Sequence, residues 1–376
     1  MLLRACNELG RDLAMAKGIR VARGERPGRG VTVIDVAAKA GVSPMTVSRV
    51  INGQPGVGAK TRAIVGEAIR ALGYKPNAAA RSLVTSTELK IGVIYSNPSA
   101  AFMSDFLTGV FEEASNRGAR LVLLKGEGGR PPSRAALDGL VASGVSGVIV
   151  APPLGEAAAV LAVLRAARLP MAAVGAHQID DAICVRIDDR RAAQEMTQEL
   201  IAMGHRRLGF IVGNSDQAAS VERLAGFYAA ARETDGVETV VAQGDFSFAS
   251  GLAAGEQLLD ASPPPTAIFA SNDDMAAAVV SVAHRRQIDV PRELTVVGFD
   301  DTTAAVTLWP PLTTVHQPVH RLAAEALSLL AAQIGAAERP PGKHADLILE
   351  HEITHRQSAR PIPVRSGSVR QASRPS

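Results

Sequence analysis

Residues 31–53 read VTVIDVAAKAGVSPMTVSRVING, and this stretch decides the fold of the N-terminal region. Thr32 followed three residues later by Asp35 is typical of a helix start, and a glycine after the first helix permits a tight turn. Ser43 before Pro44 indicates the start of a second helix, because a proline at the first helical position loses no hydrogen bond. Two short helices joined by a glycine turn predict a helix-turn-helix.

Each of these helices is expected to have one apolar face, made by Val33, Val36, Ala37 and Ala40 in the first and by Val47, Val50 and Ile51 in the second. The outer face of the second helix then carries Met45, Thr46, Ser48 and Arg49. Small and basic outward groups at this place are typical of a helix that reads the DNA major groove. An ordinary pair of antiparallel helices is the alternative for these residues taken alone.

A third helix is predicted over 60–72, where Gly58 stands in place of the expected capping serine. It completes a three-helix headpiece over 31–76. Residues 77–89 are Ala-rich but too short for a stable isolated helix, so we expect a hinge that becomes helical on binding. Residues 1–30 carry six arginines without periodicity and are expected to be a disordered arm or a misassigned start.

The net charge of +3 hides an asymmetry between the two ends of the chain. Residues 1–90 hold 15 Lys or Arg and 6 Asp or Glu, whereas the remainder holds 25 and 31. A basic N-terminal region fits a module that docks on phosphates. No apolar run reaches about 18 residues and no secretory signal is evident. With only Cys6 and Cys184, we expect a reducing, cytoplasmic location and no membrane partner.

From Lys90 onward, short β-branched runs alternate with Ala-rich helical segments. The strand-like runs are KIGVIYS, ARLVLLK, SGVIVAP, PMAAVGA, RLGFIVG, ETVVAQG, TAIFAS and LTVVGFDD. This alternation predicts an α/β core of parallel sheets over 90–358, and its roughly 260 residues predict two doubly wound lobes. Ligands of such folds bind at the carboxyl ends of strands, often between domains. Residues 359–376 have no leucine heptads and are expected to be a disordered tail.

Four later stretches join the first one as specific landmarks: RLAGF at 223–227, ASNDDMA at 270–276, VVGFDD at 296–301 and PPLTTVHQP at 310–318. Together they resemble the lac repressor/gal repressor (LacI/GalR) family of bacterial transcription regulators over about 31–358. The resemblance implies a headpiece, a hinge and a periplasmic-binding-protein-like core whose chain crosses three times between lobes, at about 90–187 plus 319–346 and 188–316 plus 347–358. It also implies a homodimer on a pseudo-palindromic operator in double-stranded DNA.

The same resemblance implies roles for headpiece and hinge residues. The positions that match base-reading residues are Pro44, Met45 and Arg49, of which the arginine can form two hydrogen bonds to a guanine. Those that match phosphate contacts are Thr32, Thr46, Ser48 and Asn52. In the hinge, Leu83 matches a leucine wedged into the minor groove, and Ala80 matches a small residue that lets two hinge helices approach.

A small effector is implied for the core. The matching positions are Arg223, Phe246, Asn272 and Asp300, with Phe102, expected in the loop after the first core strand, and Gln317 as weaker matches. One aromatic face with polar groups suits a sugar, and a purine stays open for the same reason. Asn272 and Asp300 could instead serve as a helix cap and a turn residue. Gly175 aligns where the lac repressor has an aspartate at the sugar, so the ligand or its orientation is expected to differ.

Residues 351–355, HEITH, fit the zinc-protease pattern H-E-x-x-H, which requires a helix. The surrounding LILEHEIT alternates with period two and predicts a strand, on which the two histidines would lie about 13 Å apart. We therefore expect no enzyme activity, no metal and no cofactor. The expected function is a ligand-responsive repressor, with a sugar as effector. The alternatives are a regulator that responds to a purine or another metabolite, and a sugar-binding protein without a regulatory role.

Overall fold

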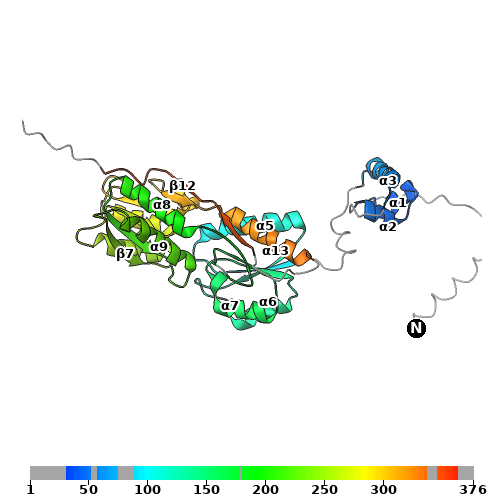
Figure 1. Cartoon of the computed structure of the whole chain (residues 1–376), viewed down its shortest axis with the longest axis horizontal. Coiled ribbons are helices and arrows are strands. Elements are labelled where there is room, and N and C mark those ends of the chain that lie inside the picture. The colour runs from blue at the N-terminus through cyan, green and yellow to red at the C-terminus, as the bar shows by residue number, and fades with distance from the viewer. Residues whose placement is uncertain (1–30, 52–56, 75–88, 178, 337–344, 363–376) are drawn as a thin grey trace, which may run out of the picture. The chain divides into compact units, whose positions relative to one another are not determined.

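The computed structural model describes residues 31–51, 57–74, 89–177, 179–336 and 345–362. The chain divides into two compact units, residues 1–86 and 87–376 (Figure 1). The described residues of the first unit, within 31–74, are called the headpiece below, and those of the second unit, within 89–362, are called the core. In the part of the chain that the structure describes, no helix is long and apolar enough to cross a membrane.

The headpiece contains α1 (Val33–Ala40), α2 (Pro44–Ile51) and α3 (Ala59–Leu72). The predicted start of α1 is confirmed, since the Asp35 carboxylate accepts a hydrogen bond from the Thr32 backbone N–H at 2.8 Å. Ser43 caps α2 by accepting from the Thr46 backbone N–H at 3.1 Å. At α3, Gly58 provides no side-chain cap, as the sequence suggested.

The apolar faces of the three helices meet in a small core. Its buried members are Val36, Ala37, Val47, Val65, Ala68 and Tyr74, with Val33, Ala40, Val50 and Ile51 packed against it. The predicted inward faces of α1 and α2 are therefore confirmed, and the predicted three-helix arrangement with them. The predictions for Asn52, for Ala80 and Leu83 in the hinge, and for the arm over 1–30 lie outside the described residues.

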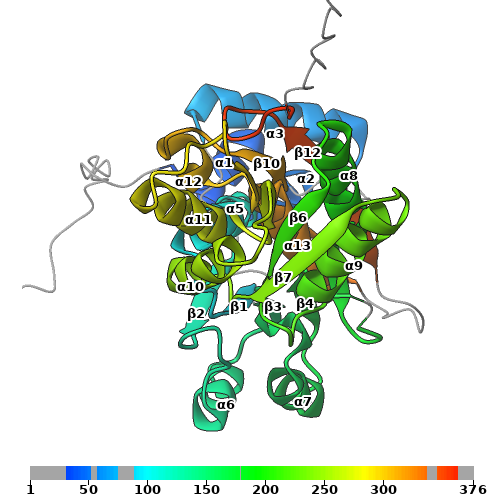
Figure 2. The same cartoon turned by 90° about the vertical axis from the view of Figure 1, so that its left-hand side faces the viewer.

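The first lobe of the core, the N-lobe, contains a parallel sheet in the order β11-β5-β4-β3-β1-β2. Its strands are β1 (Lys90–Tyr95), β2 (Arg120–Lys125), β3 (Gly147–Val150), β4 (Met171–Val174), β5 (Ile183–Ile187) and β11 (Asp346–Leu349). Its helices are α5 (Ala100–Arg117), α6 (Arg134–Ala142), η1 (Leu154–Glu156), α7 (Ala158–Ala166) and α13 (Val319–Gly335). Helices α5 and α13 pack on one face of the sheet, and α6 and α7, at the bottom of Figure 2, pack on the other.

The second lobe, the C-lobe, has the strand order β12-β10-β9-β8-β6-β7, parallel except for the β10–β12 pair. Its strands are β6 (Arg207–Val212), β7 (Glu238–Gln243), β8 (Ala267–Ala270), β9 (Thr295–Asp300), β10 (Thr313–His316) and β12 (Glu352–Thr354). Its helices are α8 (Asp189–Ala202), α9 (Ala218–Arg232), α10 (Phe248–Leu259), α11 (Asp273–Arg285) and α12 (Thr303–Thr307). Helices α8 and α9 cover one face, and the other three helices cover the opposite face.

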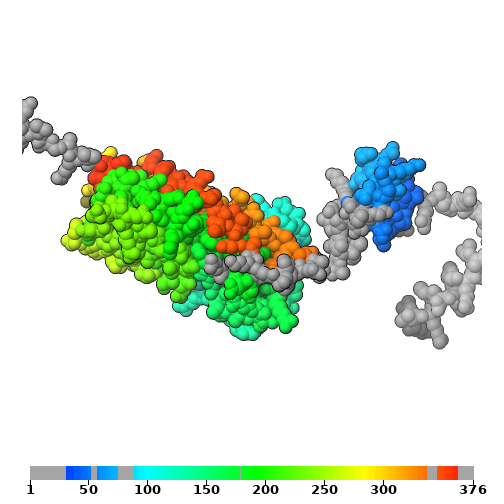
Figure 3. Space-filling view, in the orientation of Figure 1, coloured from blue at the N-terminus to red at the C-terminus, as the bar shows by residue number. Residues whose placement is uncertain are grey.

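The chain crosses between the lobes three times, as predicted, but the third crossing lies later than expected. Asp346–Leu349 pairs in parallel with β5 and so belongs to the N-lobe, which moves the crossing to residues 350–351. In Figure 3 the orange to red residues of α13 and the C-terminal segment lie along one edge of both lobes.

The tail predicted from residue 359 begins later than expected. The Ile362 backbone N–H donates to the Met203 carbonyl at 2.8 Å, so the chain packs on the C-lobe at least up to residue 362.

The HEITH segment is not helical, as predicted, but it is not one strand either. LILEHEIT divides into β11 and β12, which belong to different sheets. The His351 Nε2 atom bonds to Glu195 at 2.8 Å, whereas the His355 Nδ1 atom lies 3.5 Å from Glu199. The two histidines thus pair with different carboxylates of α8. Among the described residues, no group of three or more His, Cys, Asp or Glu side chains is placed to hold a metal.

Candidate functional site

A pocket with about 700 Å³ of space, including its open mouth, lies between the two lobes. Several of its polar lining residues follow the carboxyl ends of strands in the two sheets, for example Asn97 after β1, Asn272 after β8 and Gln317 after β10. In parallel sheets these strand ends lie on one edge, so two facing lobes bring many loop residues together. The pocket is therefore where the sequence predicted a ligand site.

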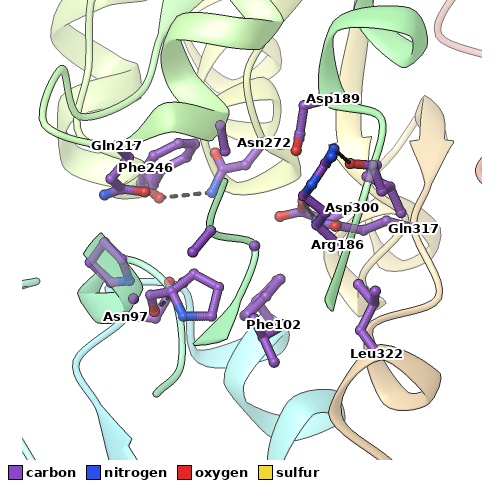
Figure 4. Close-up of a pocket in the computed structure, with 18 of the residues that line it drawn as sticks. Asn97, Phe102, Arg186, Asp189, Gln217, Phe246, Asn272, Asp300, Gln317 and Leu322 are labelled. Carbon is purple, nitrogen blue, oxygen red and sulfur yellow. Dashed lines mark hydrogen bonds between the residues drawn. The ribbon is translucent and has the colours of Figure 1, made fainter. Parts of the chain in front are cut away.

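All six predicted effector residues line this one pocket: Phe102, Arg223, Phe246, Asn272, Asp300 and Gln317. Figure 4 shows Phe246 and Asn272 on one side of the cavity and Phe102 with Leu322 on the other. One detail of the prediction is wrong, because Phe102 lies in the first turn of α5 and not in a loop. Ser99 caps this helix by accepting from the Phe102 backbone N–H at 3.3 Å, so the helix begins earlier than expected.

Arg223, on α9, is buried and held by several contacts. Its Nε atom donates to Asp189 at 2.8 Å and its Nη1 atom to the Ser271 carbonyl at 2.6 Å. The guanidinium also lies 3.6 Å from the centre of the Phe299 ring and 3.8 Å from the Asp300 carboxylate. These contacts fix the guanidinium plane and balance its charge within the wall of the pocket.

Asp300 and Gln317 form a second polar pair in the wall. The Gln317 Nε2 atom donates to the Asp300 carboxylate at 2.6 Å. Burial raises the pKa of Asp300 well above its usual range, against the opposing effects of Arg223 and of the Gln317 hydrogen bond. Asp300 ends β9 and does not lie in a turn, but its φ of 105° is a backbone conformation that residues with a side chain rarely adopt. The same residue thus shapes the backbone and presents a carboxyl group at the pocket.

Asn272 and Phe246 are linked to each other. The Asn272 Oδ1 atom caps α11 by accepting from the Met275 backbone N–H at 2.9 Å, which confirms the helix-cap interpretation. Its Nδ2 atom donates to the Phe246 carbonyl at 2.9 Å, the dashed line in Figure 4. Phe246 has a φ of 70°, and its ring lies so close to the Gly213 backbone that a Cβ atom there would collide with it. The aromatic ring is thereby fixed at the pocket.

A buried carboxyl group behind the pocket was not predicted. Asp273, in the first turn of α11, accepts hydrogen bonds from the Thr314 hydroxyl at 2.6 Å and from the Thr302 backbone N–H at 2.7 Å. Burial raises its pKa to about 7 in spite of these bonds. The group ties the ends of β9 and β10 to α11, which also carries the Asn272 cap.

The sequence interpretation missed further lining residues, above all Asp189, Arg186, Glu156 and Gln217. Asp189 begins α8, two residues after the end of β5, and this position just past a strand end was the available signal. Arg186 gave no such signal, because its partner Asp346 is 160 residues away. Its guanidinium donates to both oxygens of that carboxylate, at 3.0 and 2.8 Å. Both arginines of the lining are therefore paired with aspartates.

The base-reading candidates lie on one helix of the headpiece. Pro44, Met45 and Arg49 are all exposed on α2, with Met45 at 65%. The described phosphate candidates, Thr32, Thr46 and Ser48, are all half-buried, and the Thr32 hydroxyl donates to Asp35 at 2.6 Å. The outer face of α2 thus offers an apolar and a basic side chain, as a recognition helix requires.

Comparisons with known proteins agree with both units. Residues 32–77 match the family model "Bacterial regulatory proteins, lacI family", and residues 197–359 match "Periplasmic binding protein-like domain". HTH-type transcriptional regulator CelR of Thermobifida fusca is 37% identical over 341 residues, which is 86% of this chain and 96% of that protein. HTH-type transcriptional repressor PurR of Photobacterium profundum is 33% identical over 308 residues, or 81% and 92% of the two chains.

Two solved structures are similar to this one. The transcriptional regulator CelR–cellobiose complex has 32% sequence identity and a TM-score of 0.65, and the match covers 88% of this chain and 100% of that one. The lac repressor dimer bound to operator and the anti-inducer ONPF has 28% identity and a TM-score of 0.63, over 88% and 99%. The chain therefore belongs to the lacI family: it is a DNA-binding transcriptional regulator and not an enzyme, with a helix-turn-helix headpiece and a periplasmic-binding-protein-like effector domain.

Proposed function

We propose that this regulator is a repressor of carbohydrate-utilisation genes, and that a small sugar bound between its lobes changes its operator affinity. It acts as a homodimer on a pseudo-palindromic operator in the cytoplasm. The observation that carries the proposal is that six residues, spread from Phe102 to Gln317, meet in one pocket with an aromatic ring and several polar groups. This combination suits a ligand that has both an apolar face and hydroxyl groups.

The charges of the lining favour an uncharged sugar over a phosphorylated one. Arg223 is paired with Asp189, and Arg186 is paired with Asp346. Glu156 and Asp300 add two further carboxyl groups, and no lysine or histidine is among the described residues that line the pocket. A phosphate in this pocket would lose its water without meeting an unpaired cation, which is costly.

A purine is the second candidate, because the Phe246 ring could stack on a base and the PurR repressor is among the similar proteins. The two candidates differ in the expected response. A sugar is expected to weaken operator binding, as an inducer does, and a purine to strengthen it, as a co-repressor does.

The mechanism is a shift between two populations of the dimer. One population holds both headpieces at the spacing of the operator half-sites, and the other does not. The effector shifts the balance only by its different affinity for the two states. On the DNA side, Arg49 is the residue that discriminates between bases, through hydrogen bonds to a guanine.

The test is a fluorescence-anisotropy titration against a selected DNA pool at fixed salt concentration. It is repeated with neutral sugars including cellobiose and ribose, with their phosphorylated counterparts, and with adenine, guanine and hypoxanthine. Tight palindrome-selective binding that one neutral sugar weakens is the expected result. A response to a phosphorylated sugar alone would contradict the charge argument, and strengthening by a purine would establish the second candidate.

A pair of variants separates specific from general DNA binding. Arg49→Ala should remove about 1–3 kcal/mol of base discrimination, while Arg70→Ala, which removes the same charge from the last turn of α3, should not. Both should leave sugar binding intact. If the two variants lost DNA affinity equally and the affinity depended strongly on salt, DNA binding would rest on attraction to phosphates alone. That result would refute the repressor function.

A further inference from the structure

Helix α9 begins at Ala218 without a capping side chain of its own. Gln217, at the N-cap position, makes no side-chain hydrogen bond to the helix, and the first turn holds no acidic residue. The first N–H groups of a helix have no partner within the helix and carry partial positive charge. The start of α9 is therefore stabilised by any acceptor, and above all by a carboxylate, that comes from outside the helix.

Glu156 supplies that carboxylate from the other lobe. It ends η1, in the N-lobe segment that follows β3. Its Oε2 atom accepts from the Ala218 backbone N–H at 3.0 Å, and its Oε1 atom accepts from the His177 backbone N–H at 2.9 Å. His177 follows β4, so the N-lobe fixes one oxygen of Glu156 while the other caps a helix of the C-lobe.

The position of this contact makes it sensitive to the separation of the lobes. Glu156 and Gln217 both line the pocket. Figure 4 shows Gln217 across the cavity from Asp189 and Gln317, which adjoin two of the crossings between the lobes. A rotation about the crossings moves groups on the far side of the cavity furthest apart. Opening the cleft therefore breaks the Glu156–Ala218 hydrogen bond and leaves α9 uncapped.

We propose that Glu156 is a positioning residue for the effector site: it caps α9 across the cleft and so holds the core closed. Arg223 lies on the same helix, five residues after Ala218, and lines the same pocket. Closure thus places the Arg223 wall opposite the N-lobe wall around Phe102. The effect on effector affinity rests on the proposed function, whereas the effect on closure does not depend on any ligand.

Closure is measured by the distance between spin labels at Asp138→Cys on α6 and Asp235→Cys after α9, two exposed positions in different lobes. The full chain is used, with Cys6 and Cys184 replaced by serine and alanine. In Glu156→Ala we expect the distribution to move toward longer distances, with the open population raised about tenfold, as for the loss of a helix cap. Glu156→Gln should give a smaller shift, since its amide keeps an acceptor but loses the charge.

Glu127→Ala is the matched control, since it removes an exposed carboxylate from the same lobe. A second variant separates closure from the stability of α9. Gln217→Asp in the Glu156→Ala background gives α9 a cap of its own, so it should restore the melting temperature but leave the distances long. If the distances return to the wild-type distribution, Glu156 acts only through helix stability and the proposal is wrong. An unchanged distribution in Glu156→Ala overturns it as well.

The same variants are titrated with the neutral sugar that responds in the operator assay. Its dissociation constant should rise about tenfold in Glu156→Ala and stay unchanged in Glu127→Ala. Longer distances with unchanged sugar affinity would refute the positioning role. If the distances lengthen but no sugar binds the wild type, the cap across the cleft stands and the proposed sugar response fails.

Discussion

Asp273 shows at the scale of one residue how burial changes the acidity of a carboxyl group. Its pKa of about 7 lies above the value near 3.9 expected in the unfolded chain. Between these values the native state keeps a proton that the unfolded chain releases, so the free energy of unfolding should fall as the pH rises from about 4 to 7. The loss is at most about 4 kcal/mol, since one pKa unit corresponds to about 1.4 kcal/mol.

Urea unfolding at several pH values measures this slope. Asp273→Asn should reduce the slope without abolishing it, because one of the two buried carboxyl groups with a raised pKa is gone while Asp300 remains. Asp138→Asn, which removes an exposed carboxylate on α6, should leave it as in the wild type. An equal slope in wild type and Asp273→Asn would show that another group dominates the pH dependence.

Gly213 decides where the Phe246 ring lies. A Cβ atom at residue 213 would collide with the ring, so Gly213→Ala should displace Phe246 from the pocket. Because the ring provides the aromatic face of the proposed sugar site, we expect at least about a tenfold loss of sugar affinity, about 1.4 kcal/mol. Isothermal titration with the responding sugar measures it. Gly139→Ala, where an added Cβ atom meets no other residue, is the control. Equal sugar affinities in the two variants would show that Phe246 does not contribute to sugar binding.

At the level of secondary-structure elements, the packing of α8 against α9 depends on a glycine. A Cβ atom at Gly226 would collide with the Arg190 backbone of α8, so the two helices approach this closely only with glycine there. Gly226→Ala should push the helices apart and destabilise the core by about 1–3 kcal/mol. Thermal unfolding measures the effect, and Gly335→Ala, at an uncrowded position of α13, serves for comparison. A melting temperature unchanged by both substitutions would show that the helices adjust without cost.

At the level of the whole molecule, the protein is proposed to form a homodimer, and its single tryptophan offers a test. Trp309 is 73% exposed, and Val306, three residues earlier, is 55% exposed. Exposed apolar side chains mark an interface where they gather into one patch, so we expect these two residues to lie in the dimer contact. Trp309→Asp should weaken the dimer at least about tenfold in sedimentation, since a charge would be buried in the contact. Val221→Asp, at a 54% exposed position of α9, should not, and a dimer unchanged by Trp309→Asp would place the interface elsewhere.

Much of the fold was predictable because it rests on local patterns. Thr32 with Asp35, and Ser43 before Pro44, specify helix starts through contacts within a few residues. The β-branched runs specify strands in the same local way, and their alternation with helices leads to the two parallel sheets. The predicted third crossing, between residues 346 and 347, was wrong. The sheet that a short strand joins depends on a distant partner strand, here β5.

Local patterns were enough to predict the headpiece and the two lobes, and the family resemblance was enough to select six of the residues that line the pocket. The way in which the charges of the lining are balanced depends instead on the folded chain. The partners of Arg223 and Arg186 lie 34 and 160 residues away, and nothing in the local sequence selects them. The cap that Glu156 places on α9 likewise joins residues 62 apart in different lobes. Local patterns fix helices and strands because the contacts are short-range, whereas charge pairing and closure depend on which distant segments the fold brings together.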